Sequence, residues 1–463
     1  MKTENKVNKV KNTKQDKKVE KKDNILFKKI IIFSFVAILL IGFGVGLSIF
    51  NKSQKKLYSN EMLNLNNTKV QQNFEDLGYV ERNISKDYNN EGICERYPVY
   101  GKGLDNISDT EKDNLIAEAN KLFADEGNYD AIDQNGNYIL NGVATGKKLY
   151  KHTASKDMYE GNVSDTEKAI IRKVNVNPTI WRNYITGLYA APGELVKIEI
   201  SKSDLEKIGS LKVAVGQVTH KNTRNNIWKA DKNIFSRLPN IANTLNITST
   251  TAYVGNPLGG PIYIYPEKHD TFSVTISGAV EYPCYIHGYT TREEFERMKT
   301  LSAPYYDFEV WDKGVRHSGP KSRANFDYDN LVKVGDLWEK ICRTSSRVPT
   351  NSSAESGVGY IYDPFVAAGE AVAFVGGRIA VNAPLYWMSG ALDYNGMVKN
   401  GFWGTIHEFN HHFQNYGMEG ASTNEVTNNA TSLLSYALYT DISSARSEDD
   451  STLSGWNRYT DPS

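Results

Sequence analysis

The motif H-E-x-x-H, formed by His407, Glu408 and His411, sets a strict requirement on the fold of this chain. Residues four positions apart share one face of an α-helix, so the two imidazoles can reach one metal ion only if this segment is helical. Glu408 stands beside the pair and can take a proton from a water molecule that the metal activates. The alternative interpretation is an amphipathic helix in which both histidines are ordinary surface or core residues.

A catalytic zinc site with this motif needs a third protein ligand. Metzincins place Gly three residues and His six residues after the second motif histidine, and this chain has neither. Two carboxylates follow instead, at Glu419 and Glu425. We predict Glu425, because it opens a run with helical apolar spacing, whereas Glu419 lies in a glycine-flanked turn. The alternative role for Glu425 is a capping box with Ser422.

Five further residues are candidates for supporting roles. His412 faces about 100° away from the preceding histidine on a helix, so we expect it to support the site or the fold without binding metal. Asn428 or Asn429 can orient a ligand side chain, or can simply lie on a helix surface. Gly259 and Gly260 can let substrate approach the backbone, or can form a plain turn.

Four segments, in order, resemble the M60-like, enhancin-type family of zinc peptidases. They are TGLYAAPGE at 186–194, NPLGGPIYI at 256–264, ISGAVEYP at 276–283, and the motif region at 405–429. The resemblance implies a zinc metallopeptidase that acts on glycoproteins, mucins in particular. It also implies that His407, His411 and Glu425 bind Zn²⁺ and that Glu408 is the catalytic base.

The segments upstream of the motif predict strands, whereas those around it predict helices. Short alternating, β-branched segments predict antiparallel strands at 196–200, 211–215, 262–265 and 272–276. We therefore expect a β-sandwich over 176–290, followed by a mainly helical zinc peptidase region of the gluzincin type over 291–463. Within the latter, 371–375 and 378–381 predict paired strands, which either bind extended substrate or form a structural hairpin. The expected fold class is α+β with several domains.

The N-terminal part predicts a membrane anchor. Residues 1–29 carry eleven lysines and four acidic residues, and residues 30–50 are uncharged and mostly apolar. Twenty-one helical residues span about 30 Å, the thickness of a bilayer core. We expect a single transmembrane helix with the lysine-rich tail in the cytoplasm and the enzyme outside the cell. A cleaved signal peptide and a secreted enzyme are the alternative. Since the basic excess is confined to the tail, no nucleic-acid partner is expected.

The segments between this anchor and the sandwich carry weaker patterns. Residues 51–90 are polar and rich in Asn, which predicts a spacer. Two Ser-x-x-Glu patterns within 91–175 predict helix starts and hence a small helical region. Three cysteines, Cys94, Cys284 and Cys342, are too far apart for a zinc site, so we expect one disulfide or free buried thiols.

Two expectations concern the whole protein. Members of the resembled family continue well past the corresponding point, so we expect that the catalytic region is truncated at residue 463. The principal alternative function is a mucin- or glycan-binding adhesin that keeps the fold but has little peptidase activity. A membrane-anchored structural protein with a coincidental motif is a third. The intact motif favours the enzyme.

Overall fold

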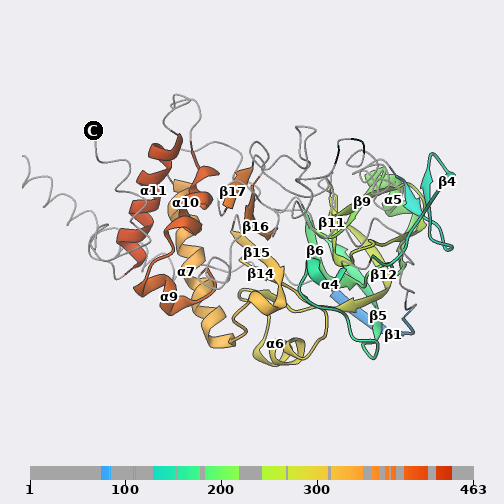
Figure 1. Cartoon of the computed structure of the whole chain (residues 1–463), viewed down its shortest axis with the longest axis horizontal. Coiled ribbons are helices and arrows are strands. Elements are labelled where there is room, and N and C mark those ends of the chain that lie inside the picture. The colour runs from blue at the N-terminus through green and yellow to red at the C-terminus, as the bar shows by residue number, and fades with distance from the viewer. Residues whose placement is uncertain are drawn as a thin grey trace, which may run out of the picture. The chain divides into compact units, whose positions relative to one another are not determined.

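Two β-sheets and a group of helices make up the described part of the chain (Figure 1). The computed structural model describes residues 74–82, 84, 108, 110, 129–152, 155–177, 183–217, 242–266, 270–310, 314–347, 357–363, 371–374, 377–381, 391–414 and 424–440. All of them except the short isolated positions lie in the elements below or in the turns that connect them. They belong to one compact unit of the chain, 69–463.

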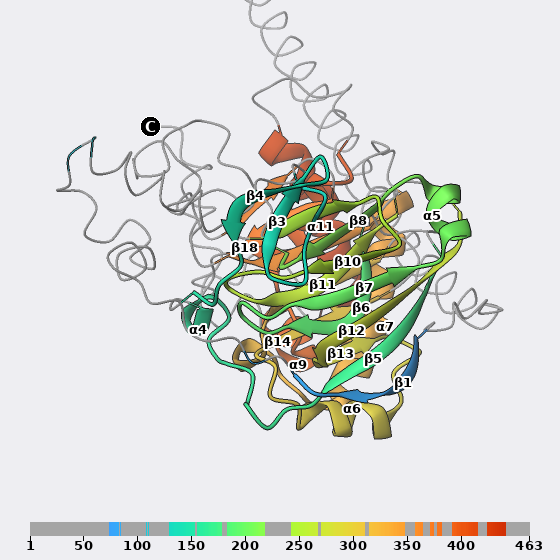
Figure 2. The ribbon, with the colours of Figure 1, turned by 90° about the vertical axis from the view of Figure 1, so that its right-hand side faces the viewer.

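The first sheet has twelve strands, and every pair in it is antiparallel. Its strands are β1 (Phe74–Val80), β2 (Ala131–Ile132), β3 (Asn137–Leu140), β4 (Val143–Lys148), β5 (Ala169–Val176), β6 (Tyr184–Ala190), β7 (Val196–Ile200), β8 (Leu211–Val215), β9 (Asn243–Ile247), β10 (Thr251–Val254), β11 (Gly260–Tyr265) and β12 (Phe272–Glu281). Figure 2 shows them side by side. Two short helices, α4 (Ser155–Met158) and α5 (Lys202–Ile208), lie in its connections.

Strand β12 joins the two halves of this sheet. Its residues 272–277 pair with β5 and β7, and its last residues pair with β6. The change of partner follows a register shift at Gly278, whose φ of +96° favours glycine. Buried side chains from both halves form one core, so the sheet folds over on itself. The four predicted strands are present. The two halves of the expected antiparallel sandwich both pair with β12 and so form a single sheet.

The second sheet is mixed and has six strands in the order β13-β14-β15-β16-β18-β17. They are β13 (Cys284–Ile286), β14 (Tyr305–Glu309), β15 (Val315–Pro320), β16 (Val358–Tyr362), β17 (Ala371–Phe374) and β18 (Arg378–Val381). The predicted pairing of 371–375 with 378–381 is confirmed within the described residues, as the antiparallel pair β17 and β18. Tyr263 of the first sheet donates a hydrogen bond to Asp307 of the second, at 2.9 Å.

The helices of the second half pack together beside this sheet (Figure 1). They are α6 (Arg292–Lys299), the 3₁₀ turn η3 (Lys321–Arg323), α7 (Tyr328–Arg347), α9 (Tyr394–Lys399), α10 (Trp403–His411) and α11 (Asn424–Tyr439). Their apolar residues form a second core around the fully buried Trp338. The region after 291 is therefore not mainly helical: the prediction missed a sheet whose strands carry buried charges, among them Asp307, Glu309 and Arg316.

Two parts of the N-terminal half differ from the prediction where the structure describes them. Residues 74–80 form β1 and pair with β5 in the first sheet, whereas the sequence predicted a polar spacer outside the folded region. Over the described residues 129–152 and 155–176 the chain forms strands β2 to β5 and the short helix α4, where a small helical region was expected. Thr110, which follows the first predicted helix start, is helical, and most of 91–128 lies outside the described residues. In β5 every second side chain is buried, because β1 and β12 pair on its two sides, and this pairing overrides the helix signal that precedes it.

The predicted membrane segment at 30–50 lies outside the described residues. Among the residues that the structure does describe, no helix is both long enough and apolar enough to span a bilayer. Cys284 and Cys342 are free and buried, which agrees with one of the two expectations for them. Cys94 lies outside the described residues.

The burial of His317, in the middle of β15, leads us to expect that the fold is sensitive to acid. It is fully buried, its ring stacks on Tyr360 at 4.4 Å, and burial lowers its pKa to about 3. The unfolded chain takes up this proton near pH 6.5 and the folded chain does not. The contribution of the neutral His317 ring to the free energy of unfolding is therefore complete above pH 6.5. Below that pH the contribution falls by about 1.4 kcal/mol per pH unit.

The variant His317→Phe keeps the stacked ring and removes this titration. We expect its midpoint of thermal unfolding to fall less steeply between pH 6 and pH 4.5 than that of the unmodified chain. His152 and His412, whose pKa values are each lowered to about 4 by burial, would leave part of the slope in place. An unchanged slope would rule out His317 as a source of the acid sensitivity.

Candidate metal centre

The helix α10 carries the H-E-x-x-H motif on its less buried side. Ile406, Phe409 and, just past the helix, Phe413 are buried in the second core. This apolar spacing anchors one face of the helix and leaves His407 and His411 half-exposed on another. The sequence favours a helix here because its apolar residues recur every three or four positions and so lie on one face, and the two motif histidines lie on another.

The structure brings His407, Glu408 and His411 together. One ligand atom from each of the three lies within 4.8 Å of the other two. The two imidazole rings stand nearly perpendicular, at 86°, with their centroids 4.8 Å apart. Among the described residues, this is the one group of three His, Cys, Asp or Glu side chains with a spacing that could hold a metal ion.

Each histidine of the pair is held by an amide oxygen. Nδ1 of His407 donates to Oδ1 of Asn429 at 2.8 Å, and Nδ1 of His411 donates to Oε1 of Gln414 at 2.8 Å. A neutral imidazole that donates from Nδ1 keeps the lone pair on Nε2. Nε2 is therefore the atom of each ring that would bind a metal, and a donor set of two imidazoles beside a carboxylate suits Zn²⁺.

A buried polar bridge fixes α10 against its two neighbouring helices. The side-chain oxygen of Asn410 accepts a hydrogen bond from Ser345 of α7 at 2.7 Å. Its amide nitrogen donates to Ser432 of α11 at 3.1 Å. Because Asn410 is fully buried, its hydrogen bonds are costly to break, and they set the distance between the motif helix and the helix that carries Asn429.

Two further contacts tie α10 to the second sheet. The hydroxyl of Tyr360, in β16, donates to the carbonyl of Thr405 in the first turn of the helix. Burial, together with the nearby charge of Glu408, raises the pKa of this tyrosine well above its usual value, so it remains a donor. At the other end, His412 is buried and its ring hydrogen-bonds the backbone of Arg378 in β18. His412 thus connects the helix to the sheet.

The structure separates the two asparagines of α11. Asn429 bonds His407, whereas Asn428 is fully buried and its side-chain atoms have no hydrogen-bond partner among the described residues. Glu425 lies in the first turn of α11, one turn before Asn429, and its side chain is outside what the structure describes. Glu419 is also outside the described residues. The role of Glu425 as third ligand stays a prediction.

The paired glycines of the first sheet have a packing role. A side chain on Gly259 would meet the carbonyl oxygen of Ala190 at 2.9 Å, and one on Gly260 would meet the backbone of Gly216 at 2.7 Å. Both have positive φ, +70° and +146°. This close backbone packing explains why both positions are glycine, and a substrate role for them stays a prediction.

Two residues of the centre were not singled out from the sequence. Gln414 orients His411 from just beyond the end of α10, and its position three residues after that histidine could have indicated the contact. Trp403 lies four residues before His407, which places it on the same helix face, and the two ring centroids are 6.4 Å apart. It is partly exposed, so an aromatic surface borders the two motif histidines.

Two family models match adjoining parts of the chain. One, described as Peptidase M60, enhancin and enhancin-like, matches residues 278–462. The other, the N-terminal domain of M60-like peptidases, matches residues 165–277. The two matches meet inside β12.

Several known proteins are similar over large parts of the chain. Antigenic protein P1 of Entamoeba histolytica is 26% identical over 385 residues, which are 79% of this chain and 32% of that protein. Antigenic protein NP1 of the same organism is 31% identical over 218 residues, 46% of this chain and 33% of that protein. This chain thus spans about a third of the length of these curated relatives. A structure of the M60 catalytic domain of ZmpC from Clostridium perfringens, in complex with the sialyl T antigen, has 17% identity and a TM-score of 0.40, covering 58% of this chain and 57% of that one.

Proposed function

Because this chain belongs to the M60-like, enhancin-type peptidase family, we propose that it is a zinc-dependent endopeptidase that cleaves glycosylated proteins such as mucins. The family is known for metallopeptidases that degrade mucins and glycopeptides. The observation that carries the proposal is the pair of histidines whose Nδ1 atoms are both engaged by amide oxygens beside Glu408. A purely structural histidine pair would not need its possible ligand atoms within 4.8 Å of each other and of a carboxylate oxygen.

The residues that would hold the ion are His407, His411 and Glu425. Zinc bound there would supply Lewis acidity and lower the pKa of water towards neutrality. Asn429 and Gln414 keep the two imidazoles in the tautomer that binds metal and limit their rotation. The hydrogen bonds through Asn410 keep α10 and α11 in register, so that the ligands of both helices stay aligned.

Glu408 is the proposed general base and general acid. Its carboxylate is half-buried and lies within 4.8 Å of the ligand atoms of both histidines. It accepts the proton of the attacking water as the water adds to the scissile carbonyl, and it then delivers that proton to the leaving amine. No charge is gained or lost on Glu408 over the complete reaction.

Trp403 is the residue best placed to contact the substrate beside the reacting bond. Its ring lies on the metal-facing side of α10, one turn before His407. A partly exposed indole offers a broad apolar face, which suits the ring of a sugar attached to the substrate. The expected location outside the cell, anchored by residues 30–50, would give the enzyme access to such substrates.

One experiment tests the proposal on the full chain. An O-glycosylated mucin and the same mucin after enzymatic removal of its O-glycans are each incubated with the protein, and the products are identified by mass spectrometry. We expect cleavage of the glycosylated form that a chelator abolishes and that added Zn²⁺ restores. Cleavage at the same rate with and without the chelator would contradict the zinc mechanism. Equal cleavage of the glycosylated and the deglycosylated mucin would contradict the preference for glycoproteins. Mucin binding without cleavage would instead support the adhesin.

A further inference from the structure

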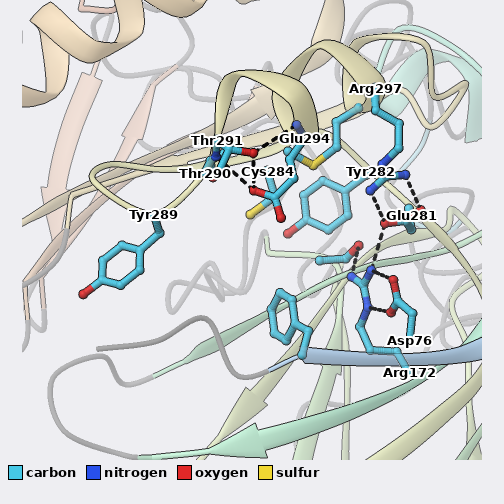
Figure 3. A pocket seen from close by; sticks show the side chains of 13 residues that line it. Asp76, Arg172, Glu281, Tyr282, Cys284, Tyr289, Thr290, Thr291, Glu294 and Arg297 are labelled. Atoms are coloured by element: carbon cyan, nitrogen blue, oxygen red, sulfur yellow. Dashed lines mark hydrogen bonds and ion pairs between the residues drawn. The ribbon is translucent and has the colours of Figure 1, made fainter. Parts of the chain in front are cut away.

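A cavity of about 400 Å³ lies beside α6, where that helix approaches β1, β5 and the end of β12 (Figure 3). None of its lining residues belongs to the metal centre. Its volume falls within the range of small-molecule sites, roughly 300–1,000 Å³. The known family chemistry at α10 does not account for it.

Four charged side chains of alternating sign run along the wall of this cavity. Asp76, Arg172, Glu281 and Arg297 form a continuous chain of ion pairs (Figure 3). The middle two are buried, with side chains 6% and 10% exposed, and the outer two are about half exposed. Because the buried pair fixes the outer pair in place, a carboxylate and a guanidinium are held ready at the mouth of the cavity.

The buried part of this chain of ion pairs is saturated. Arg172 donates to Asp76, to Glu281, and to the carbonyls of Thr186 and Gly187, which uses all five of its N–H groups. A side chain on Gly187 would reach within 2.6 Å of this guanidinium, so only glycine fits there. Arg172 therefore organises the wall but offers a ligand no hydrogen bond.

The outer part of the chain keeps hydrogen-bonding capacity. Arg297 uses two N–H groups on the two oxygens of Glu281, out of five. Each carboxylate oxygen of Asp76 takes one hydrogen bond from Arg172, which leaves lone pairs on both. The cavity thus presents free donors and free acceptors on opposite parts of its mouth.

The balance of charge restricts the chemistry of a ligand. An anion would face three carboxylates, since Glu294 also lines the cavity, and a metal cation would face two guanidinium groups. A purely apolar ligand would remove water from the exposed charges of Asp76 and Arg297 and give no hydrogen bond in return. A neutral ligand with several hydroxyl groups avoids all three costs, because a hydroxyl donates to Asp76 and accepts from Arg297. The rings of Phe74 and Tyr289 add apolar surface at the edge of the cavity.

We propose that this cavity binds a neutral saccharide unit of one or two sugars, independently of the metal centre. The role of this cavity as a second contact with a glycosylated substrate rests on the proposed function. The binding of the saccharide itself requires no catalysis. Such a contact would hold a glycan of the substrate at a distance from the scissile bond.

Binding is measured with the free disaccharide galactosyl-β1,3-N-acetylgalactosamine, by saturation-transfer NMR and by titration calorimetry, on the full chain in a detergent without a sugar headgroup. We expect Arg297→Met to weaken binding by about 10-fold or more, the usual effect of losing a hydrogen bond from a charged group. Asp76→Asn, which can still accept a hydrogen bond from Arg172, is expected to weaken it in the same direction. The matched control is Lys299→Met, which removes a cation from the same helix outside the cavity and should leave binding unchanged.

The zinc-free protein and the Glu408→Gln variant should both bind the disaccharide with unchanged affinity, which separates this proposal from the proposed peptidase. Thermal unfolding reports whether each variant is folded, and the weaker binding of a folded Arg297→Met protein supports the site. Absence of binding at millimolar disaccharide would overturn the proposal. Binding that survives both cavity variants and is lost in Trp403→Ala would also overturn it, because the sugar would then occupy the metal centre.

Discussion

Replacing Glu408 by glutamine is expected to lower kcat/KM for an O-glycosylated peptide by about 10²- to 10⁴-fold. Glutamine has nearly the same size and shape, so the packing of α10 and the positions of His407 and His411 should not change. It cannot accept a proton at neutral pH, so the water is no longer activated by a base. The measurement is the initial rate of peptide cleavage, compared with the zinc content of the same preparation.

The pattern of the two readouts identifies the role of Glu408. Full zinc content with lost activity is the expected result for a general base. Joint loss of zinc and activity would make Glu408 a metal ligand and contradict the assignment. As a matched control, Glu339→Gln removes a partly exposed carboxylate from α7, away from the metal centre, and should leave the rate unchanged.

The second large effect is expected at the metal ligands. His411→Ala removes one of the two imidazoles and should abolish both stoichiometric zinc binding and cleavage. Asn429→Ala leaves both imidazoles in place but frees the ring of His407, so we expect a smaller loss, about 10- to 100-fold in zinc affinity. Zinc affinity is measured by competition with a chromogenic chelator. Equal zinc affinities for the unmodified chain and Asn429→Ala would show that this hydrogen bond does not orient the ligand.

The same measurement decides between the two candidate carboxylates. Glu425→Gln should lower zinc affinity strongly, because Glu425 lies on the helix that also carries Asn429, which is bonded to His407. Glu419→Gln should not lower it if Glu425 is the third ligand. The reverse order would move the third ligand into the connecting turn. Since both changes replace a carboxylate with its amide, each serves as the control for the other.

The local part of the site could be predicted from sequence, because helical period alone places His407, Glu408 and His411 together. Asn429 was one of two equivalent choices, since neighbouring helix positions differ by about 100° and only the packing of α10 on α11 decides which one faces the metal. Gln414 lies three residues after His411 but beyond the end of α10, so its spacing could suggest the contact and could not establish it. The cavity beside α6 could not be predicted, because its charged residues come from four distant segments.

The fold was predictable where strands alternate and was missed where they do not. Strands β7 and β8 follow apolar alternation and were found with their correct bounds. In β14 and β15 every side chain is buried, charged ones included, so hydrophobic alternation is absent. Strand β1 was not predicted for the opposite reason: five of its seven residues are exposed, so its sequence resembles a polar linker. Pairing with β5, the ion pair from Asp76 to Arg172 and the packing of Phe74 on the first core keep it in the sheet.

Strand β12 determines how this protein can be divided, in the laboratory and in evolution. The two family models meet between residues 277 and 278, inside this strand, and β13 begins only three residues after its end. A shortened chain that starts at 278 would keep only the last four residues of β12 and would lose β5, β6 and β7, the strands that pair with it. A chain that ends at 277 would leave Leu188 and Tyr189 of β6 without their partners on β12. The two parts are therefore not interchangeable modules: a recombination event or an expression boundary at the family border would break one folding unit, and the pair must be inherited and produced together.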